Sequence, residues 1–70
     1  MNTRLRDFRE EQRLSILEMS KSLGVSKSTY EKVEYGQRTP SYNFVRRFKI
    51  KYPKTDTDAL FFADNYTESV

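Results

Sequence analysis

The sequence predicts an all-α domain of five short helices, and two observations support this prediction. Apolar side chains recur every three or four residues along most of the chain, which is the period of a helix with one buried face. The two glycines and two prolines among the 70 residues fall at or near the breaks between these helical patterns. A chain of this length makes one domain, so the helices must share a single core.

The first helix is expected at residues 3–13, because Leu5 and Phe8 face one side while charged side chains cover the other. A second helix is expected to start directly after Ser15. A serine followed three places on by a glutamate, here Glu18, is a capping box, in which each residue satisfies a backbone N–H of the other.

Gly24 separates the second helical pattern from the third and leaves room only for a tight turn. Ser26 is the expected cap of the third helix, and Gly36 closes it. The apolar positions on the two sides of the turn are Met19, Leu23, Val25, Tyr30 and Val33. Two short helices joined in this way are typical of a helix-turn-helix, whose second helix often lies in the DNA major groove. Its outward face carries Lys27, Ser28, Glu31 and Lys32.

The fourth helix is expected to begin after Ser41 and to stop before Pro53, which cannot continue a helix. Its inward residues are Phe44, Val45, Phe48 and Tyr52. Thr55 or Asp56 can cap a short fifth helix. The domain is therefore expected to span residues 1–62, with a short polar tail at residues 63–70.

Composition excludes several classes of function. The absence of cysteine and histidine excludes disulfides, the common zinc sites, thiol nucleophiles and imidazole bases. The carboxylates are scattered and no glycine-rich loop is present, so we expect neither an enzyme nor a cofactor nor a metal site. No apolar run approaches the roughly 20 residues of a membrane span, and the polar N-terminus lacks a signal segment, so no membrane partner and a cytoplasmic location are expected.

Charge is distributed unevenly along the chain. Residues 1–55 hold thirteen Lys and Arg against six Asp and Glu, whereas residues 56–70 hold four acidic residues and no basic one. A basic body of this kind favours a polyanionic partner.

Three motifs in the chain have the spacing of one known family. They are Leu5-x-x-Phe8-Arg9, Leu23-Gly24-Val25-Ser26 and Val33-Glu34-Tyr35-Gly36-x-Arg38-x-Pro40-Ser41. Over about residues 4–62 the chain resembles the Cro/repressor-type (XRE-like) helix-turn-helix family of small phage and bacterial regulators. The resemblance implies a compact five-helix, lambda-repressor-like domain with its helix-turn-helix at helices 2 and 3. It also implies a regulator that binds double-stranded operator DNA in a bacterial host cell, usually as a homodimer, as in a lysis–lysogeny switch.

The resemblance assigns roles to individual residues. The recognition helix is the stretch from Ser26 to Tyr35. Residues in the places used for base edges are Lys27, Ser28 and Lys32, and those in the places used for phosphates are Tyr35, Arg38 and Ser41. The family also pairs an arginine of its first helix with the glutamate that closes its third, here Arg9 with Glu34. Arg13 stands where the family often has a glycine, so backbone strain is expected there.

One departure from the family supports a second hypothesis. Ile16 and Leu17 occupy positions that are usually polar, and either one of them folds back onto Phe8 or Tyr30 or both form an exposed patch. As a patch, Ile16, Leu17 and Glu31 suit an antirepressor that docks on a cognate repressor protein and covers its DNA-reading surface.

The end of the chain favours self-association. Phe61, Phe62 and Tyr66 present more apolar surface than a short terminal helix buries by itself, so some of it is expected to face a partner copy.

Overall fold

A computed structural model describes residues 2–62, which contain five helical segments and no strand. Four are α1 (Thr3–Glu11), α2 (Ile16–Leu23), α3 (Lys27–Glu34) and α4 (Tyr42–Lys51). The fifth segment covers residues 57–62. The predicted all-α class is therefore confirmed. The expected polar tail, which includes Tyr66, lies outside the described residues.

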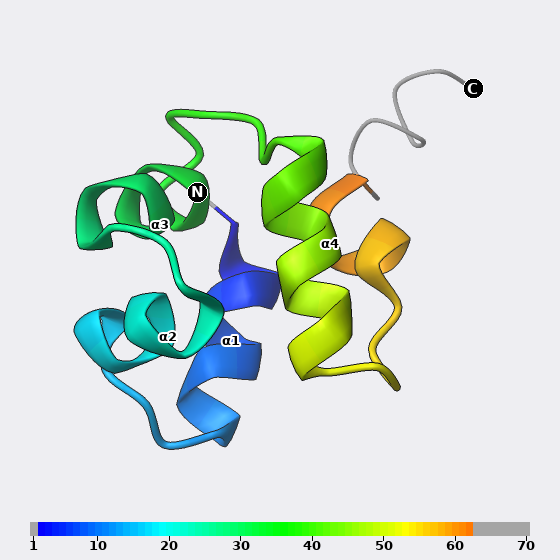
Figure 1. The fold of residues 1–70 in the computed structure, drawn as a ribbon, viewed down its shortest axis with the longest axis horizontal. Coiled ribbons are helices and arrows are strands. Elements are labelled where there is room, and N and C mark those ends of the chain that lie inside the picture. The colour runs from blue at the N-terminus through cyan, green and yellow to red at the C-terminus, as the bar shows by residue number, and fades with distance from the viewer. Residues whose placement is uncertain (1, 63–70) are drawn as a thin grey trace.

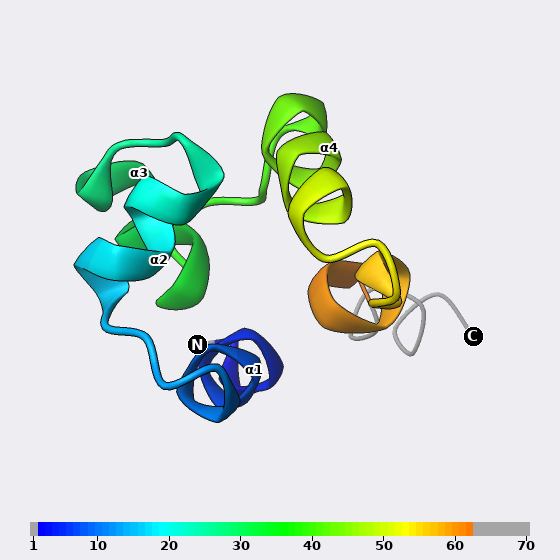
Figure 2. The same ribbon diagram turned by 60° about the horizontal axis from the view of Figure 1, so that its bottom comes forward.

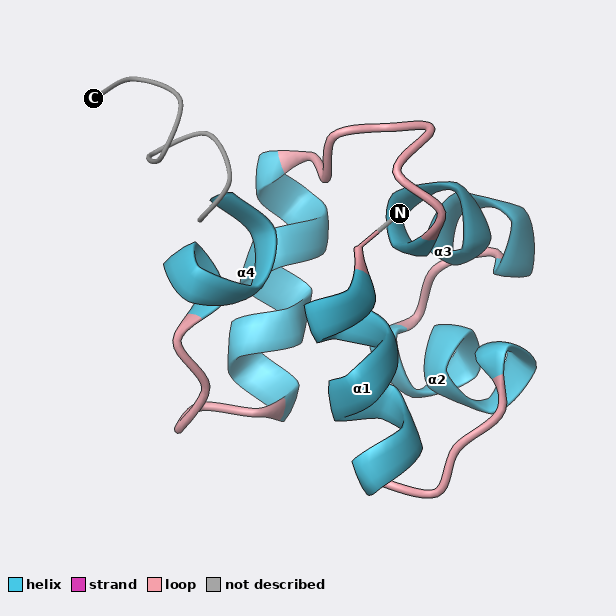
Figure 3. Cartoon of the chain, turned by 180° about the vertical axis from the view of Figure 1, so that it is seen from behind, coloured by secondary structure: helices cyan, strands magenta, loops and turns pink. Residues whose placement is uncertain are grey.

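The helices are arranged around a single core. In Figure 2, α2 and α3 lie together on one side, α4 lies opposite them, and α1 lies below. Residues 57–62 pack beside α4 on the side away from α2 and α3, as Figures 1 and 3 both show. The inward stripe of each labelled helix supplies the buried hydrophobic side chains, which are Leu5, Met19, Leu23, Tyr30, Val33, Phe44 and Phe48.

Aromatic rings extend this core to both ends of the described chain. The Phe8 ring lies 5.4 Å from Phe48 and meets the Tyr52 ring edge-on at 4.9 Å between centroids. The Phe61 ring packs edge-on against Phe44 and Phe48, at 5.8 and 5.3 Å. Each such ring removes a large apolar area from water, which a chain of this size needs. Phe61 and Phe62 are both partly buried, so they leave less surface for a partner copy than the sequence suggested.

Local hydrogen bonds place the helix ends close to where the sequence predicts them. Ser15, Ser26 and Ser41 each accept a bond from the backbone N–H three residues ahead, as helix caps do. Asp56, rather than Thr55, caps the last segment, because its carboxylate accepts from the Ala59 N–H at 3.1 Å.

The first helix is shorter than expected. It ends at Glu11 instead of continuing to residue 13. The reason is the backbone of Arg13, whose φ of 59° lies in the left-handed region and cannot continue a right-handed helix. The strain predicted at this position is therefore present. Gly24 ends α2 with a φ of 74°, which also lies in the left-handed region. Glycine adopts this conformation without steric strain because it has no side chain.

Asn2 joins three parts of the fold that are distant in sequence. Its side-chain oxygen accepts from the Leu5 N–H at 2.9 Å and caps α1. Its side-chain amide donates to the Leu60 carbonyl at 2.8 Å, and its backbone N–H donates to the Glu34 carbonyl at 2.8 Å. The start of α1 is thus tied to the end of α3 and to residues 57–62.

Among residues 2–62, no helix has the length and apolar character needed to cross a membrane.

The capping box at the start of α2 has a consequence for pH. The Ser15 N–H donates to the Glu18 carboxylate at 2.9 Å, and the Glu18 N–H donates to Ser15 Oγ at 3.1 Å. The backbone bond first, and the serine side chain second, lower the pKa of Glu18 below its usual 4.5. Because the pKa of this carboxyl is lower in the folded state than in the unfolded state, its ionisation stabilises the fold at any pH above the unfolded-state pKa. This stabilisation is lost as the pH falls through the folded-state pKa.

Ser15→Ala removes the serine hydroxyl but keeps the backbone N–H, which lowers the pKa of Glu18 most, so we expect this pKa to rise only part of the way toward 4.5. The variant should weaken the fold at neutral pH more than at a pH below the folded-state pKa of Glu18. The measurement is an NMR titration of the Glu18 side chain, together with urea unfolding at both pH values. Ser26→Ala removes the cap of α3 instead and is the matched control, which should leave the Glu18 titration unchanged. An unaltered Glu18 pKa in Ser15→Ala would contradict the assignment.

Candidate nucleic-acid interface

The sequence-predicted base-reading residues share one exposed face of α3. Ser26 caps the helix by accepting from the Thr29 N–H at 3.0 Å, directly after the turn at Gly24. Lys27, Ser28 and Lys32 are exposed, whereas the opposite side of the helix is buried. Ser28 and Lys32 are four positions apart and therefore lie one above the other on the helix, and Lys27 is adjacent to Ser28, so all three belong to the solvent-exposed part of α3.

The predicted phosphate-contacting residues lie along the segment that leads from α3 to α4, drawn in green in Figure 1. Tyr35, Arg38 and Ser41 are all exposed. The Ser41 oxygen accepts from the Phe44 N–H at 3.1 Å, which leaves its hydroxyl proton to donate. The segment therefore presents a guanidinium and two hydroxyl donors beside the exposed face of α3.

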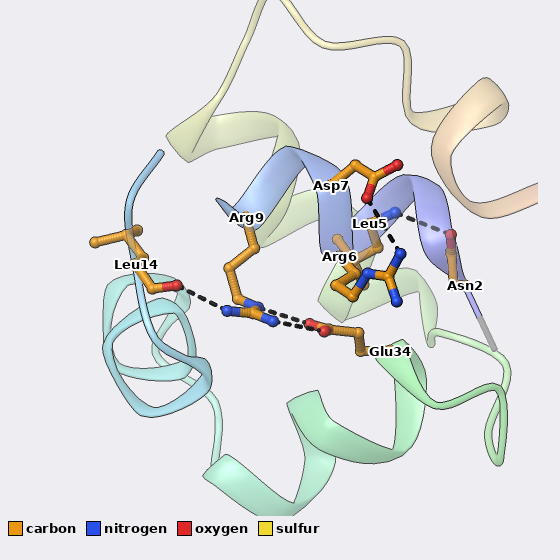
Figure 4. Close-up of polar contacts among 7 residues, drawn as sticks. All are labelled: Asn2, Leu5, Arg6, Asp7, Arg9, Leu14 and Glu34. Carbon is orange, nitrogen blue, oxygen red and sulfur yellow. Dashed lines mark hydrogen bonds and ion pairs between the residues drawn. The ribbon is translucent and has the colours of Figure 1, made fainter. Parts of the chain in front are cut away.

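A buried ion pair sets the orientation of α3. The Arg9 Nε donates to Glu34 Oε2 at 3.0 Å, and Nη2 donates to Oε1 at 2.9 Å, which is the bidentate geometry drawn in Figure 4. The third guanidinium nitrogen donates to the Leu14 carbonyl at 2.8 Å. The Glu34 side chain is only 1% exposed, and its hydrogen bond raises the pKa of Arg9. Arg9 and Glu34 thus form the pair that the resemblance implies, and it joins α1 to α3.

Tyr30 belongs to the core rather than to the exposed face of α3. Its side chain is fully buried, and its ring stacks on Phe44 with centroids 6.1 Å apart. Burial raises the pKa of Tyr30 and keeps its hydroxyl neutral. The ring therefore cannot stack on a base, as its position on the helix predicted.

The two apolar residues at the start of α2 behave differently from each other. Ile16 is partly buried and packs against the core, whereas Leu17 is 45% exposed. Glu31 on α3 is partly buried. The proposed protein-docking patch is therefore smaller than the sequence indicated, and Leu17 supplies most of its exposed apolar surface.

Sequence reasoning missed two exposed apolar side chains on α4, Tyr42 and Ile50, which are 83% and 66% exposed. Their helical spacing was the available signal, because they lie on the side opposite Phe44 and Phe48.

Within residues 2–62, no three side chains of the types that ligate metals come together.

Comparison with known proteins identifies one family. Residues 3–49 match the model of a family described as a helix-turn-helix domain, and the match runs from α1 through most of α4. No curated protein and no solved structure gives a significant match to the chain.

The Arg9–Glu34 pair leads to a stability prediction. Glu34→Gln keeps the shape of the side chain but leaves the buried guanidinium of Arg9 without an opposite charge. The free energy of unfolding should therefore fall by about 3–5 kcal/mol. Urea unfolding followed by circular dichroism measures the change. Glu11→Gln, which removes an exposed carboxylate at the end of α1, should change it by less than about 0.5 kcal/mol. Equal stabilities of the two variants would refute a structural role for the pair.

Proposed function

The chain belongs to the helix-turn-helix domain family, and we propose that it is a transcriptional regulator of the phage repressor/Cro type that binds operator DNA sequence-specifically. A family of this kind points to a DNA-binding regulator and is typically non-enzymatic. The observation that carries the finer proposal is the exposed face of α3, where Lys27, Ser28 and Lys32 stand together on a helix fixed by a buried ion pair.

The chemistry of this face suits base recognition in the major groove. A lysine ammonium can donate to the O6 and N7 acceptors of guanine, and a serine hydroxyl can serve several bases. The groove is wide enough to admit an α-helix, so these side chains can reach base edges directly. Lys27 and Lys32 are the principal candidates, because each extends a flexible cation beyond the surface of α3.

Phosphate contacts complete the proposed interface. Tyr35, Arg38 and Ser41 supply hydroxyl and guanidinium donors next to α3, and the first backbone N–H groups of α2 add partial positive charge. Such contacts release counterions, so the affinity should fall steeply as salt is added.

We further propose that residues 1–62 act as the DNA-binding domain and that two copies bind one operator as a homodimer. A two-fold dimer places its recognition helices about 34 Å apart, which matches successive turns of the major groove. A genetic switch between lysis and lysogeny is the role that this class of small regulator suggests, with no cofactor required.

The test of this proposal is the binding of the chain to duplexes from its own promoter region, measured by fluorescence anisotropy at low and moderate salt. Lys27→Ala and Lys32→Ala should each weaken binding by about 1–3 kcal/mol if the lysine reads a base, and by less if it touches only phosphate. The physical reason is the loss of direct hydrogen bonds to base edges.

Lys54→Ala is the matched control, because Lys54 is an exposed lysine that follows α4 and lies outside α3. It should retain wild-type affinity, and all three variants should keep the wild-type circular dichroism spectrum. Wild-type operator affinity in both α3 variants would remove these residues from the site. The same titration gives the number of chains on each duplex.

An antirepressor that binds a cognate repressor protein is the second candidate function. The observation that favours it is Leu17, a large apolar side chain that is 45% exposed at the start of α2, where a DNA-binding face is usually polar. Apolar surface at this point favours a protein contact over a phosphate contact, and Glu31 adds a charge that repels phosphate.

Leu17→Glu should abolish binding to a repressor encoded beside this protein, since burying such a side chain contributes about 1.5–3 kcal/mol. Calorimetry measures the interaction, and stability should be unchanged. Ile16→Gln is the comparison variant, because Ile16 packs against the core and its replacement should lower stability. Undiminished repressor binding by Leu17→Glu would eliminate this patch.

A further inference from the structure

A groove of about 390 Å³ lies where the end of α2 meets the outer side of α4. Its lining consists of Ser22, Leu23, Arg46, Arg47, Ile50 and Lys51. None of the residues proposed above to contact DNA or a repressor lines it. The proposed contacts with DNA and with a repressor therefore do not involve this groove.

The apolar part of this surface comes from the outward face of α4. Tyr42, Arg46 and Ile50 follow one another at four-residue intervals, so they form a single stripe along the helix. Ile50 is 66% exposed and Tyr42 is 83% exposed, although Phe44 and Phe48 already fill the inward face. An outer helix normally keeps its solvent side polar, so two large apolar side chains there indicate a contact surface.

The charged residues that line the groove are all positive. Three of its six lining residues are cations, and none is acidic. Arg47 is held in place, because its Nη1 donates to the Leu23 carbonyl at 3.4 Å and lies above Gly24. A side-chain carbon on Gly24 would stand 2.7 Å from that nitrogen, so the glycine makes room for the guanidinium. One cation of the groove is thus positioned before any partner arrives.

We infer that this groove docks a protein partner through an acidic segment that places an apolar side chain on Ile50 and carboxylates on the surrounding cations. Bidentate pairing with carboxylates is what a guanidinium favours, and Arg46 and Arg47 flank the apolar contact. The inference goes beyond the proposed DNA binding and does not depend on it.

Charge argues against the other occupants. Two copies of this chain that met through the groove would bring Arg46, Arg47 and Lys51 against the same three cations, and like charges in contact are repulsive. A DNA backbone would satisfy the cations but would leave Ile50 against hydrated phosphates, with no apolar partner.

The test uses the full isotope-labelled chain and a short synthetic peptide with blocked ends, composed of Glu and Asp around two central leucines. We expect the peptide to shift the NMR amide signals of Ser22, Leu23, Arg47 and Ile50. A second peptide, in which serine replaces both leucines, should bind at least about tenfold more weakly, because the apolar contact is lost.

Two variants within the groove are compared with one control variant outside it. Ile50→Glu and Arg46→Glu should each weaken the leucine peptide at least about tenfold. Lys54→Glu makes the same charge reversal at an exposed position outside the groove, and it should keep wild-type affinity. Circular dichroism establishes that all three variants are folded.

Other outcomes would overturn the inference. Equal binding of the leucine and serine peptides would make the groove a simple polyanion site. Shifts of the same four residues on addition of duplex DNA would assign it to nucleic acid, and concentration-dependent shifts without peptide would assign it to a second copy. Absence of peptide-induced shifts at the groove residues would show that an acidic segment does not bind there.

Discussion

The buried pair between Arg9 and Glu34 is the constraint on which the rest of this small fold depends. A carboxylate that is almost wholly removed from water is destabilising unless its oxygens find donors, and here a bidentate guanidinium donates one hydrogen bond to each oxygen. The same guanidinium holds the Leu14 carbonyl, and Asn2 holds the Glu34 carbonyl. Because these hydrogen bonds form only within a narrow range of distances and angles, they fix α1, the α1–α2 connection and α3 relative to one another.

This constraint matters because the apolar core alone is small. Seven fully or nearly buried apolar side chains hold four helices together, and partly buried rings such as Phe8 and Phe61 extend the packing at its edges. Hydrophobic burial is non-directional, so it would tolerate some rotation of a helix as short as α3. The ion pair is directional, so it fixes the rotation of α3 about its axis. The side chains on the exposed face of α3 are oriented by the same contact.

The two outward helix faces divide the proposed functions between them. The outer face of α3 is polar and cationic, which suits bases and phosphates. The outer face of α4 combines cations with Ile50 and Tyr42, which suits an acidic protein surface. Both faces are available because the inward stripe of each helix is sufficient to build the core.

The sequence by itself determined where α2, α3 and α4 begin, because Ser15, Ser26 and Ser41 act through hydrogen bonds that span three residues. Periodicity likewise indicated which face of α3 is exposed, and the family resemblance implied the ion pair across 25 residues. Only the tertiary structure decided that Ile16 turns inward while Leu17 stays exposed, and that Asn2 reaches three segments. It also decided which surface of α4 meets the end of α2. These outcomes depend on neighbours from distant parts of the chain, and no local spacing encodes their positions.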